Sequence, residues 1–234
     1  MRFEPFIDDS KTPELLRGIY PIINVEPASD IEDILEKTSK FPEAGIKIVQ
    51  LRAKRFIDEK LPGILDDLVN ELRGSGLAVI LNDYIELAEM TGADGVHLGL
   101  DDYPIFNARA MLGPDAIIGA TCRNAAEALM AIGQGATYIA AGSIYESGTK
   151  PGLPVIGAWG LREIVEHIKE EGPPRMGWNQ YNRTPVCAIG GITIDKIRDV
   201  KSAGADMAAV VGAIWNSPDV FEAARGLVEE WNKY

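Results

Sequence analysis

The stretch TGADGVHL, residues 91–98, decides the fold, and two further stretches repeat its pattern, QGATYI at 134–139 and AGADMA at 203–208. In each of them a Gly-Ala pair and one polar residue precede an apolar run. A glycine commonly ends a helix in the left-handed conformation, and the apolar run that follows predicts a strand. The recurrence therefore predicts a chain in which helices and strands alternate.

The same alternation extends along most of the chain. Eight short apolar runs predict strands, at 19–24, 46–51, 77–81, 94–98, 116–119, 137–141, 185–189 and 207–211. Amphipathic stretches between them predict helices, among them 30–40, 58–73, 103–112, 124–133, 158–170 and 194–202, and a last helix follows the eighth strand.

These strands are apolar on both faces, which favours a parallel sheet covered on both sides. Eight strands, nearly all followed by a helical pattern, predict an α/β fold of the (β/α)8, or TIM-barrel, class in a single domain. A doubly wound open sheet is the alternative. Such a sheet would carry a glycine-rich fingerprint after its first strand, and residues 24–27 read Asn-Val-Glu-Pro instead.

Two segments lie outside the repeat. We expect residues 1–18 to form an N-terminal extension and residues 19–234 to form the barrel, with a polar insertion at 171–184 before the seventh strand. The insertion is interpreted as a surface loop, or alternatively as a dimer contact through Trp178 and Tyr181. The sequence leaves a homo-oligomer open.

The charge balance limits the partners. The 234 residues include 23 Lys and Arg against 35 Asp and Glu, a net charge of −12, which argues against a nucleic-acid partner. A small phosphorylated ligand stays compatible, because a few local cations or a metal can hold it. The two cysteines form no CxxC motif, and no apolar run is long enough to cross a membrane. We therefore expect a cytoplasmic protein without membrane or nucleic-acid partners.

Polar residues follow the predicted strands at the end where TIM barrels carry their functional groups. After the second strand, Gln50, Arg52 and Lys54 alternate and would share one side, where they suit a ring edge and a polyphosphate. A solvated strand end is the other interpretation. Asp83 follows the third strand and Asp102 the fourth, so the two carboxylates could share Mg²⁺ with water and substrate phosphates.

Two of these residues have a second interpretation. Asp102 could serve as the N-cap of the next helix. His97, within the fourth strand, is either a buried hydrogen-bonded residue or a direct substrate contact.

The last three strands lead into loops rich in glycine and hydroxyl groups. The loop 142–152 contains Ser147, Thr149 and Lys150, which could surround a phosphate, although a plain surface loop is the alternative. Gly191 follows the seventh strand, and Val211 with Gly212 follows the eighth, at the start of a helix. Helix N-termini at this position of a barrel are typical phosphate sites.

On these motifs the chain resembles the thiamine-phosphate synthase family over roughly residues 19–228, nearly the whole predicted barrel. The motifs are Gln50-Leu51-Arg52 with Lys54, Asn82-Asp83, residues 92–99 with Asp102, Thr149-Lys150, and residues 188–192. The family joins a pyrimidine pyrophosphate to a thiazole phosphate, so the resemblance implies small phosphorylated substrates and Mg²⁺.

The resemblance also implies a role for each matching residue. Gln50, Arg52, Lys54, Asn82 and Lys150 would hold the pyrimidine pyrophosphate, with Arg52, Lys54 and Lys150 as the catalytic cations. Thr121 would face the pyrimidine, and Asp83 and Asp102 would bind Mg²⁺. The thiazole phosphate would be bound by Ser147, Thr149, Gly191, Val211 and Gly212.

The chain departs from the family pattern at five positions. It has Asn24 for the usual Asp, Leu100 for Gln, Arg123 for His, Glu146 within the Gly142–Ser147 loop, and Gly212 for Ser. Three alternatives therefore stay open. These are a sibling of the same fold that acts as a thiazole tautomerase or regulator, another phosphate-binding barrel such as an aldolase or epimerase, and a non-catalytic barrel that binds a phosphate ligand. An aldolase would need a Schiff-base lysine, and Lys47 is the only lysine within a predicted strand.

Overall fold

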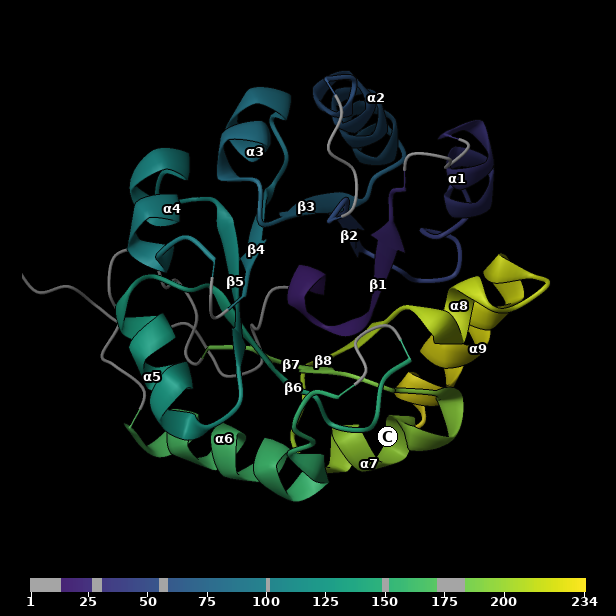
Figure 1. Cartoon of the computed structure of the whole chain (residues 1–234). Helices are drawn as coiled ribbons and strands as arrows, with labels where there is room; N and C mark the ends of the chain where they lie inside the picture. The colour runs from purple at the N-terminus through teal and green to yellow at the C-terminus, as the bar shows by residue number, and fades with distance from the viewer. Residues whose placement is uncertain (1–13, 27–30, 55–58, 100–101, 149–151, 172–183) are drawn as a thin grey trace, which may run out of the picture.

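The computed structural model describes residues 14–26, 31–54, 59–99, 102–148, 152–171 and 184–234. Its eight strands are parallel and form a closed barrel in the order β1 to β8, with β8 paired to β1 (Figure 1). The strands are β1 Gly18–Asn24, β2 Ile48–Arg52, β3 Ala78–Asn82, β4 Gly95–Leu98, β5 Ile117–Cys122, β6 Tyr138–Gly142, β7 Val186–Ile189 and β8 Met207–Val210. The predicted (β/α)8 class is confirmed.

Helices surround the barrel (Figure 1). They are α1 Ile31–Thr38, α2 Leu61–Gly74, α3 Ile85–Thr91, α4 Ile105–Leu112, α5 Ala125–Gly133, α6 Gly157–Glu171, η2 Ile194–Lys196, α7 Ile197–Ser202, α8 Gly212–Trp215 and α9 Val220–Asn232. The short helix η1 Glu14–Leu16 precedes β1 and packs against the barrel interior through Leu16. Helix α3 has seven residues and lies outside the predicted helical ranges. Among the described residues, none of the helices combines the length and apolar composition needed to cross a bilayer.

The repeated Gly-Ala-polar pattern has a common structural role. Gly92, Gly135 and Gly204 all have positive φ and lead from a helix into a strand. The polar residue two positions later accepts a hydrogen bond from a backbone N–H of the preceding strand: Asp94 from Val79, Thr137 from Ile118 and Asp206 from Val186, at 2.8–2.9 Å. These hydrogen bonds therefore link β4 to β3, β6 to β5 and β8 to β7.

The core has two layers because successive strand residues point to opposite sides of the sheet. An outer layer packs between strands and helices, and an inner layer fills the barrel. The inner layer includes Tyr20, Ile48, Ile80, Tyr138 and Met207, and Leu16 of η1 joins it with 1% exposure. The segment just before β1 thus belongs to the barrel core, whereas residues 1–13 lie outside the described residues.

Two basic residues at the N-terminal side of the barrel are structural. Lys47 was expected within a strand, but β2 begins one residue later, and Lys47 is exposed and pairs with Glu14 at 2.9 Å. It therefore offers no buried amine for a Schiff base. Arg109 of α4 is 8% exposed and donates hydrogen bonds to the carbonyls of Gly113, Pro114, Ala116 and Gly135 and to the Thr137 hydroxyl.

The polar insertion begins at the end of α6, and its residues 172–183, with Trp178 and Tyr181, lie outside the described residues. Both interpretations of this segment, as a surface loop and as a dimer contact, therefore stay predictions.

Candidate active site

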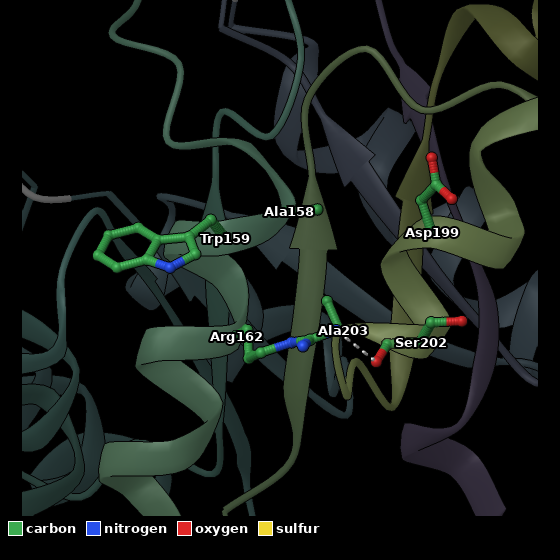
Figure 2. A pocket seen from close by; sticks show the side chains of 6 residues that line it. All are labelled: Ala158, Trp159, Arg162, Asp199, Ser202 and Ala203. Carbon is green, nitrogen blue, oxygen red and sulfur yellow. Dashed lines mark hydrogen bonds between the residues drawn. The ribbon is translucent and has the colours of Figure 1, made fainter.

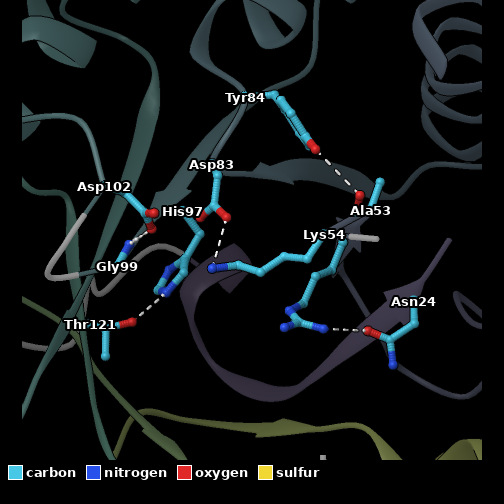
Figure 3. Close-up of polar contacts among 10 residues, drawn as sticks. Asn24, Ala53, Lys54, Asp83, Tyr84, His97, Gly99, Asp102 and Thr121 are labelled. Atoms are coloured by element: carbon cyan, nitrogen blue, oxygen red, sulfur yellow. Dashed lines mark hydrogen bonds and ion pairs between the residues drawn. The ribbon is translucent and has the colours of Figure 1, made fainter. Parts of the chain in front are cut away.

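The pleat of the barrel brings the predicted residues to one opening. Counting by twos from the inner core residues leads to Asn24, Gln50, Arg52, Asn82, His97 and Thr121 near the carboxyl ends of β1 to β5. Strand register supports this placement, since Asn24 lies beside Arg52 and Asn82 beside His97. Figure 3 shows three of these side chains, Asn24, His97 and Thr121, around the same space. We refer to this opening as the mouth.

Two carboxylates and a lysine meet at the mouth beside β3. The Asp83 carboxylate lies 3.0 Å from the Lys54 ammonium, as Figure 3 shows. Burial raises the pKa of the Asp83 carboxyl, the hydrogen-bonded Asp102 carboxyl raises it further, and Lys54 opposes this rise. Asp83 also has a φ of 73°, a left-handed conformation uncommon outside glycine. The chain therefore holds two carboxyl groups together where they repel each other when ionised.

This donor set fits a hard divalent cation. Mg²⁺ is usually held by one or two carboxylates, with water and substrate phosphates completing its octahedron. Asp83 and Asp102 supply two such ligands, and no group of three or more metal-binding side chains occurs within the described residues. The pair suits a metal shared with a phosphorylated ligand better than a closed protein cage.

Polar donors stand next to the carboxylates. Arg52 donates to the Asn24 side-chain oxygen at 3.1 Å, which ties the guanidinium to the end of β1. The Asn82 side-chain nitrogen is buried and has no hydrogen-bond partner among the described residues. A buried amide without a partner costs about 1–3 kcal/mol. Such a donor is suited to an anionic oxygen that is present only when a ligand binds.

The N-cap interpretation of Asp102 is wrong. Helix α4 begins after Pro104, and its first turn has no side-chain cap. Asp102 instead accepts a hydrogen bond from the backbone N–H of Gly99, just after β4, at 2.6 Å. This bond keeps the Asp102 carboxylate near Asp83.

His97 is buried, with 5% exposure, and is hydrogen-bonded on both ring nitrogens. Nδ1 lies 2.9 Å from the Tyr138 hydroxyl, and Nε2 lies 2.9 Å from the Thr121 hydroxyl. The structure thus matches the first interpretation of His97, a buried hydrogen-bonded residue. It also places Thr121 at the mouth, in contact with His97 (Figure 3). The sequence analysis did not single out Tyr138, although its strand position faces inward.

The opposite side of the mouth is built from backbone. The loop after β6 pairs with the end of β7, with Ile144 N–H donating to Ile189 and Tyr145 N–H to Gly190. Gly191 has a φ of 61°, and a Cβ there would lie 2.2 Å from the Glu146 carbonyl oxygen. Gly191 is therefore needed for contact between the two loops, whatever ligand they bind.

Ser147 is half-buried in this loop, and Glu146 before it is exposed. Val211 and Gly212 are half-buried and begin the four-residue helix α8. Thr149 and Lys150 lie outside the described residues, as does Leu100. Their predicted contacts therefore stay predictions.

One cation on this side was missed by the sequence analysis. The Lys196 ammonium donates to the Gly191 carbonyl at 2.9 Å and lies 4.4 Å from the centre of the Tyr145 ring. Its only sequence signal was its position three residues after Thr193, at the start of a helix. Thr193 is the N-cap of η2 by position, but its hydroxyl donates to the Asp195 carboxylate instead of capping the backbone.

A pocket of about 330 Å³ lies elsewhere, between α6 and α7 on the outside of the barrel (Figure 2). Its lining residues are Ala158, Trp159, Arg162, Asp199, Ser202 and Ala203. None of them is among the predicted site residues, and Arg162 donates only to the Ser202 carbonyl, at 3.4 Å. The pocket is therefore separate from the mouth.

Comparisons with known proteins bear on the family to which this chain belongs. A family model described as thiamine monophosphate synthase matches residues 19–214. The thiamine-phosphate synthase of Thioalkalivibrio sulfidiphilus is 38% identical over 93% of this chain and 97% of its own, and that of Methylobacillus flagellatus is 36% identical over 93% and 96%. The solved structure of thiamine phosphate pyrophosphorylase from Pyrococcus furiosus superposes with a TM-score of 0.74, at 30% identity, over 94% of this chain and 98% of that one.

Proposed function

This chain belongs to the thiamine monophosphate synthase family, and we propose that it is a thiamine-phosphate synthase, a transferase that joins hydroxymethylpyrimidine pyrophosphate to thiazole phosphate and releases pyrophosphate. The observation that carries the proposal is the cluster of Asp83, Asp102 and Lys54, with Arg52 beside it, at one edge of the mouth. This cluster pairs a site for a divalent cation with the cations that a pyrophosphate needs.

The proposed binding roles rest on the family resemblance and, for the described residues, on their position at the mouth. Arg52, Lys54 and Lys150 hold the pyrophosphate, and the Asn82 amide donates to one of its oxygens. Gln50 and Thr121 contact the pyrimidine from two sides of the mouth. Ser147 and Thr149 bind the thiazole phosphate together with the backbone at Gly191, Val211 and Gly212. The partners are thus small phosphorylated molecules.

Asp83 and Asp102 are the proposed ligands of Mg²⁺. When bound, the ion supplies positive charge that stabilises the departing pyrophosphate. It would also relieve the repulsion between the two carboxylates, which raises the pKa of Asp83 in the protein alone.

The reaction requires little proton transfer by protein side chains. The bond from the pyrimidine methylene carbon to the pyrophosphate oxygen breaks, and the oxygen keeps the electron pair. The electron-rich aminopyrimidine stabilises the methylene cation, and the thiazole nitrogen then forms a bond to that carbon. Arg52, Lys54 and Lys150 stabilise the negative charge that develops on the leaving group. The nearest histidine, His97, is buried behind Thr121 and serves no proton transfer in this scheme.

The tautomerase or regulatory sibling is less well supported, because in that branch the pyrophosphate and metal residues are eroded, whereas this chain has Arg52, Lys54, Asp83 and Asp102. A non-catalytic barrel would bind the substrates without converting them. A single assay of product formation separates a synthase from a barrel that only binds the substrates.

The test is to incubate the protein with both substrates and Mg²⁺ and to follow thiamine phosphate by mass spectrometry. We expect product with the wild type and with Asp115→Asn, an exposed carboxylate before β5, and a large loss with Asp83→Asn. Folded wild-type protein that makes no product would contradict the proposal. Equal product from wild type and Asp83→Asn would contradict the metal assignment alone.

A further inference from the structure

Five side chains form one continuous chain of hydrogen bonds through the interior of the barrel. The Gln50 side-chain nitrogen lies 3.0 Å from the Tyr20 hydroxyl, and the Tyr20 and Tyr138 hydroxyls are 3.1 Å apart. Tyr138 continues to His97 Nδ1, and His97 Nε2 reaches Thr121, at 2.9 Å each. The chain begins and ends on the two residues assigned to the pyrimidine. We call it the relay.

Counting donors fixes the direction of the protons along the relay. Gln50 donates to Tyr20 through its amide N–H, so the Tyr20 proton must point elsewhere. Among the described residues, the other hydrogen-bond neighbour of the Tyr20 hydroxyl is the hydroxyl of Tyr138. Tyr20 therefore donates to Tyr138, and Tyr138 in turn donates to His97 Nδ1. A neutral imidazole that accepts at Nδ1 carries its proton on Nε2 and donates it to Thr121.

Tyr20 and Tyr138 take part in this chain of hydrogen bonds as neutral hydroxyl groups. Both are fully buried, and burial raises the pKa of Tyr20 and of Tyr138 well above the usual value. Neither hydroxyl ionises near neutral pH, so each keeps one proton and must be a donor to one neighbour only. The direction of donation along the relay can then reverse only if all five side chains exchange their donor and acceptor roles together.

Strand β5 is shaped to allow the central bond. Gly119 lies between His97 and Tyr138 in the strand register. A Cβ on Gly119 would lie 2.1 Å from Tyr138 Cζ, 2.3 Å from the Tyr138 hydroxyl and 2.5 Å from His97 Nδ1. Since no side chain fits there, the tyrosine and the histidine meet across β5, with ring centres 5.7 Å apart.

We propose that the relay fixes complementary roles at the two sides of the mouth: Gln50 presents its carbonyl oxygen as an acceptor, and Thr121 presents its hydroxyl as a donor. This inference rests on the proposed function for the identity of the ligand. The matching ligand is a flat heteroaromatic ring with an exocyclic amino group toward Gln50 and a ring nitrogen lone pair toward Thr121. Tyr20, Tyr138 and His97 are positioning residues for that recognition.

The test reads the tautomer of His97 by ¹⁵N NMR in the full-length protein without ligands. The sequence has two histidines, so the spectrum contains two rings. His167 Nδ1 lies 2.8 Å from the Glu163 carbonyl, which only accepts, so neutral His167 is the Nδ1–H tautomer and serves as an internal contrast. We expect His97 to be the Nε2–H tautomer. An Nδ1–H or doubly protonated His97 in the wild type at pH 8 would overturn the proposal.

A substitution at the far end of the relay tests transmission. Gln50→Glu places a carboxylate, which only accepts, next to Tyr20. At pH 8 we expect the order to reverse, so that His97 changes to the Nδ1–H tautomer three hydrogen bonds away. In Gln50→Glu with Tyr138→Phe, the link is cut and the change should be absent. An Nε2–H tautomer in folded Gln50→Glu, with His167 unchanged, would overturn the proposal.

The kinetics of the Tyr138→Phe variant show whether Tyr138 positions the groups that bind the pyrimidine or only stabilises the fold. Loss of one net hydrogen bond, about 1 kcal/mol, should raise KM for the pyrimidine substrate roughly fivefold and leave KM for thiazole phosphate unchanged. Equal changes in both KM values would overturn the positioning role. If the protein formed no thiamine phosphate at all, the proposed function would fail, while the tautomer measurements would still decide the relay.

Discussion

The two sides of the mouth are made from different parts of the chain. Beside β2 to β4, the mouth is lined by charged side chains: Asp83 and Lys54 form an ion pair, and Arg52 is hydrogen-bonded to Asn24. Beside β6 to β8, the mouth is lined by backbone, with Gly190 and Gly191 packed against the loop 143–146. On the charged side, removal of a single group should change substrate binding or turnover. On the backbone side, binding should respond instead to atoms that a substitution adds. The predictions below test this contrast from the largest expected effect to the smallest.

Metal removal should have the largest effect. If Asp83 and Asp102 hold Mg²⁺, chelation with EDTA should lower turnover by about 10³-fold or more, because a metal contributes several kcal/mol to the stabilisation of a leaving group. Added Mg²⁺ or Mn²⁺ should restore the rate in a steady-state assay. Full turnover in excess EDTA would contradict the two-carboxylate site and with it the charged character of this side.

Removal of one cation should come next. Lys150→Met should lower kcat about 10²-fold, the scale of losing one group that stabilises the developing charge. Its melting temperature should stay within about 1–2 °C of the wild type, since we expect this lysine to serve the ligand and to add little to stability. Lys169→Met, on the exposed side of α6, is the matched control and should change neither quantity. A large drop in melting temperature with near-normal turnover would make Lys150 a structural residue.

The glycine side should respond to an added donor by a smaller factor. A Cβ on Gly212 would lie 2.9 Å from the Asn216 side-chain nitrogen, the end of a side chain that can move aside. Gly212→Ser adds a hydroxyl donor and should lower KM for thiazole phosphate about fivefold, while Gly212→Ala adds the carbon without the donor. Calorimetry with thiazole phosphate alone checks the affinity. Equal behaviour of the two variants would place the phosphate elsewhere.

Glu146→Gln should have the smallest effect. The carboxylate is exposed, so water screens it from a bound phosphate. We expect KM for thiazole phosphate to change by less than about twofold at physiological ionic strength. A tenfold fall in KM would show that Glu146 faces the phosphate and opposes its binding.

The same contrast explains what the sequence could reveal. The alternation of strands and helices predicted the barrel. The position of Gln50, Arg52, Asn82 and Asp83 at the carboxyl ends of strands predicted that they lie at one opening, because parallel strands with period-two geometry leave few other arrangements. Contacts that depend on residues far apart in the chain had no local signal. Arg109 reads as one more surface cation of a helix, yet it bonds carbonyls up to 26 residues away.

The two tyrosines of the relay show the same limit. Tyr20 and Tyr138 are 118 residues apart and lie in runs that read as ordinary apolar strands. Their inward direction could be derived from the pleat, but their contact depends on the closure of the barrel. Helix α3 was missed for a different reason: its seven residues are too few for a clear helical period.

The Gly-Ala-polar motif also divides the polypeptide into separable pieces. The bond from Val79 to Asp94 joins β3 to β4, and the bond from Ile118 to Thr137 joins β5 to β6, so a backbone cut near residue 114 breaks neither. Two fragments expressed from separate genes, 1–114 and 115–234, would each retain their own strand fasteners, and Arg109 would dock one onto the carbonyl of Gly135 in the other. A cut between β3 and β4 would separate Asp94 from Val79 instead. Either cut separates two paired strands, but only the cut near residue 114 keeps all three side-chain bonds of the motif, so we expect the halves to reassemble more readily.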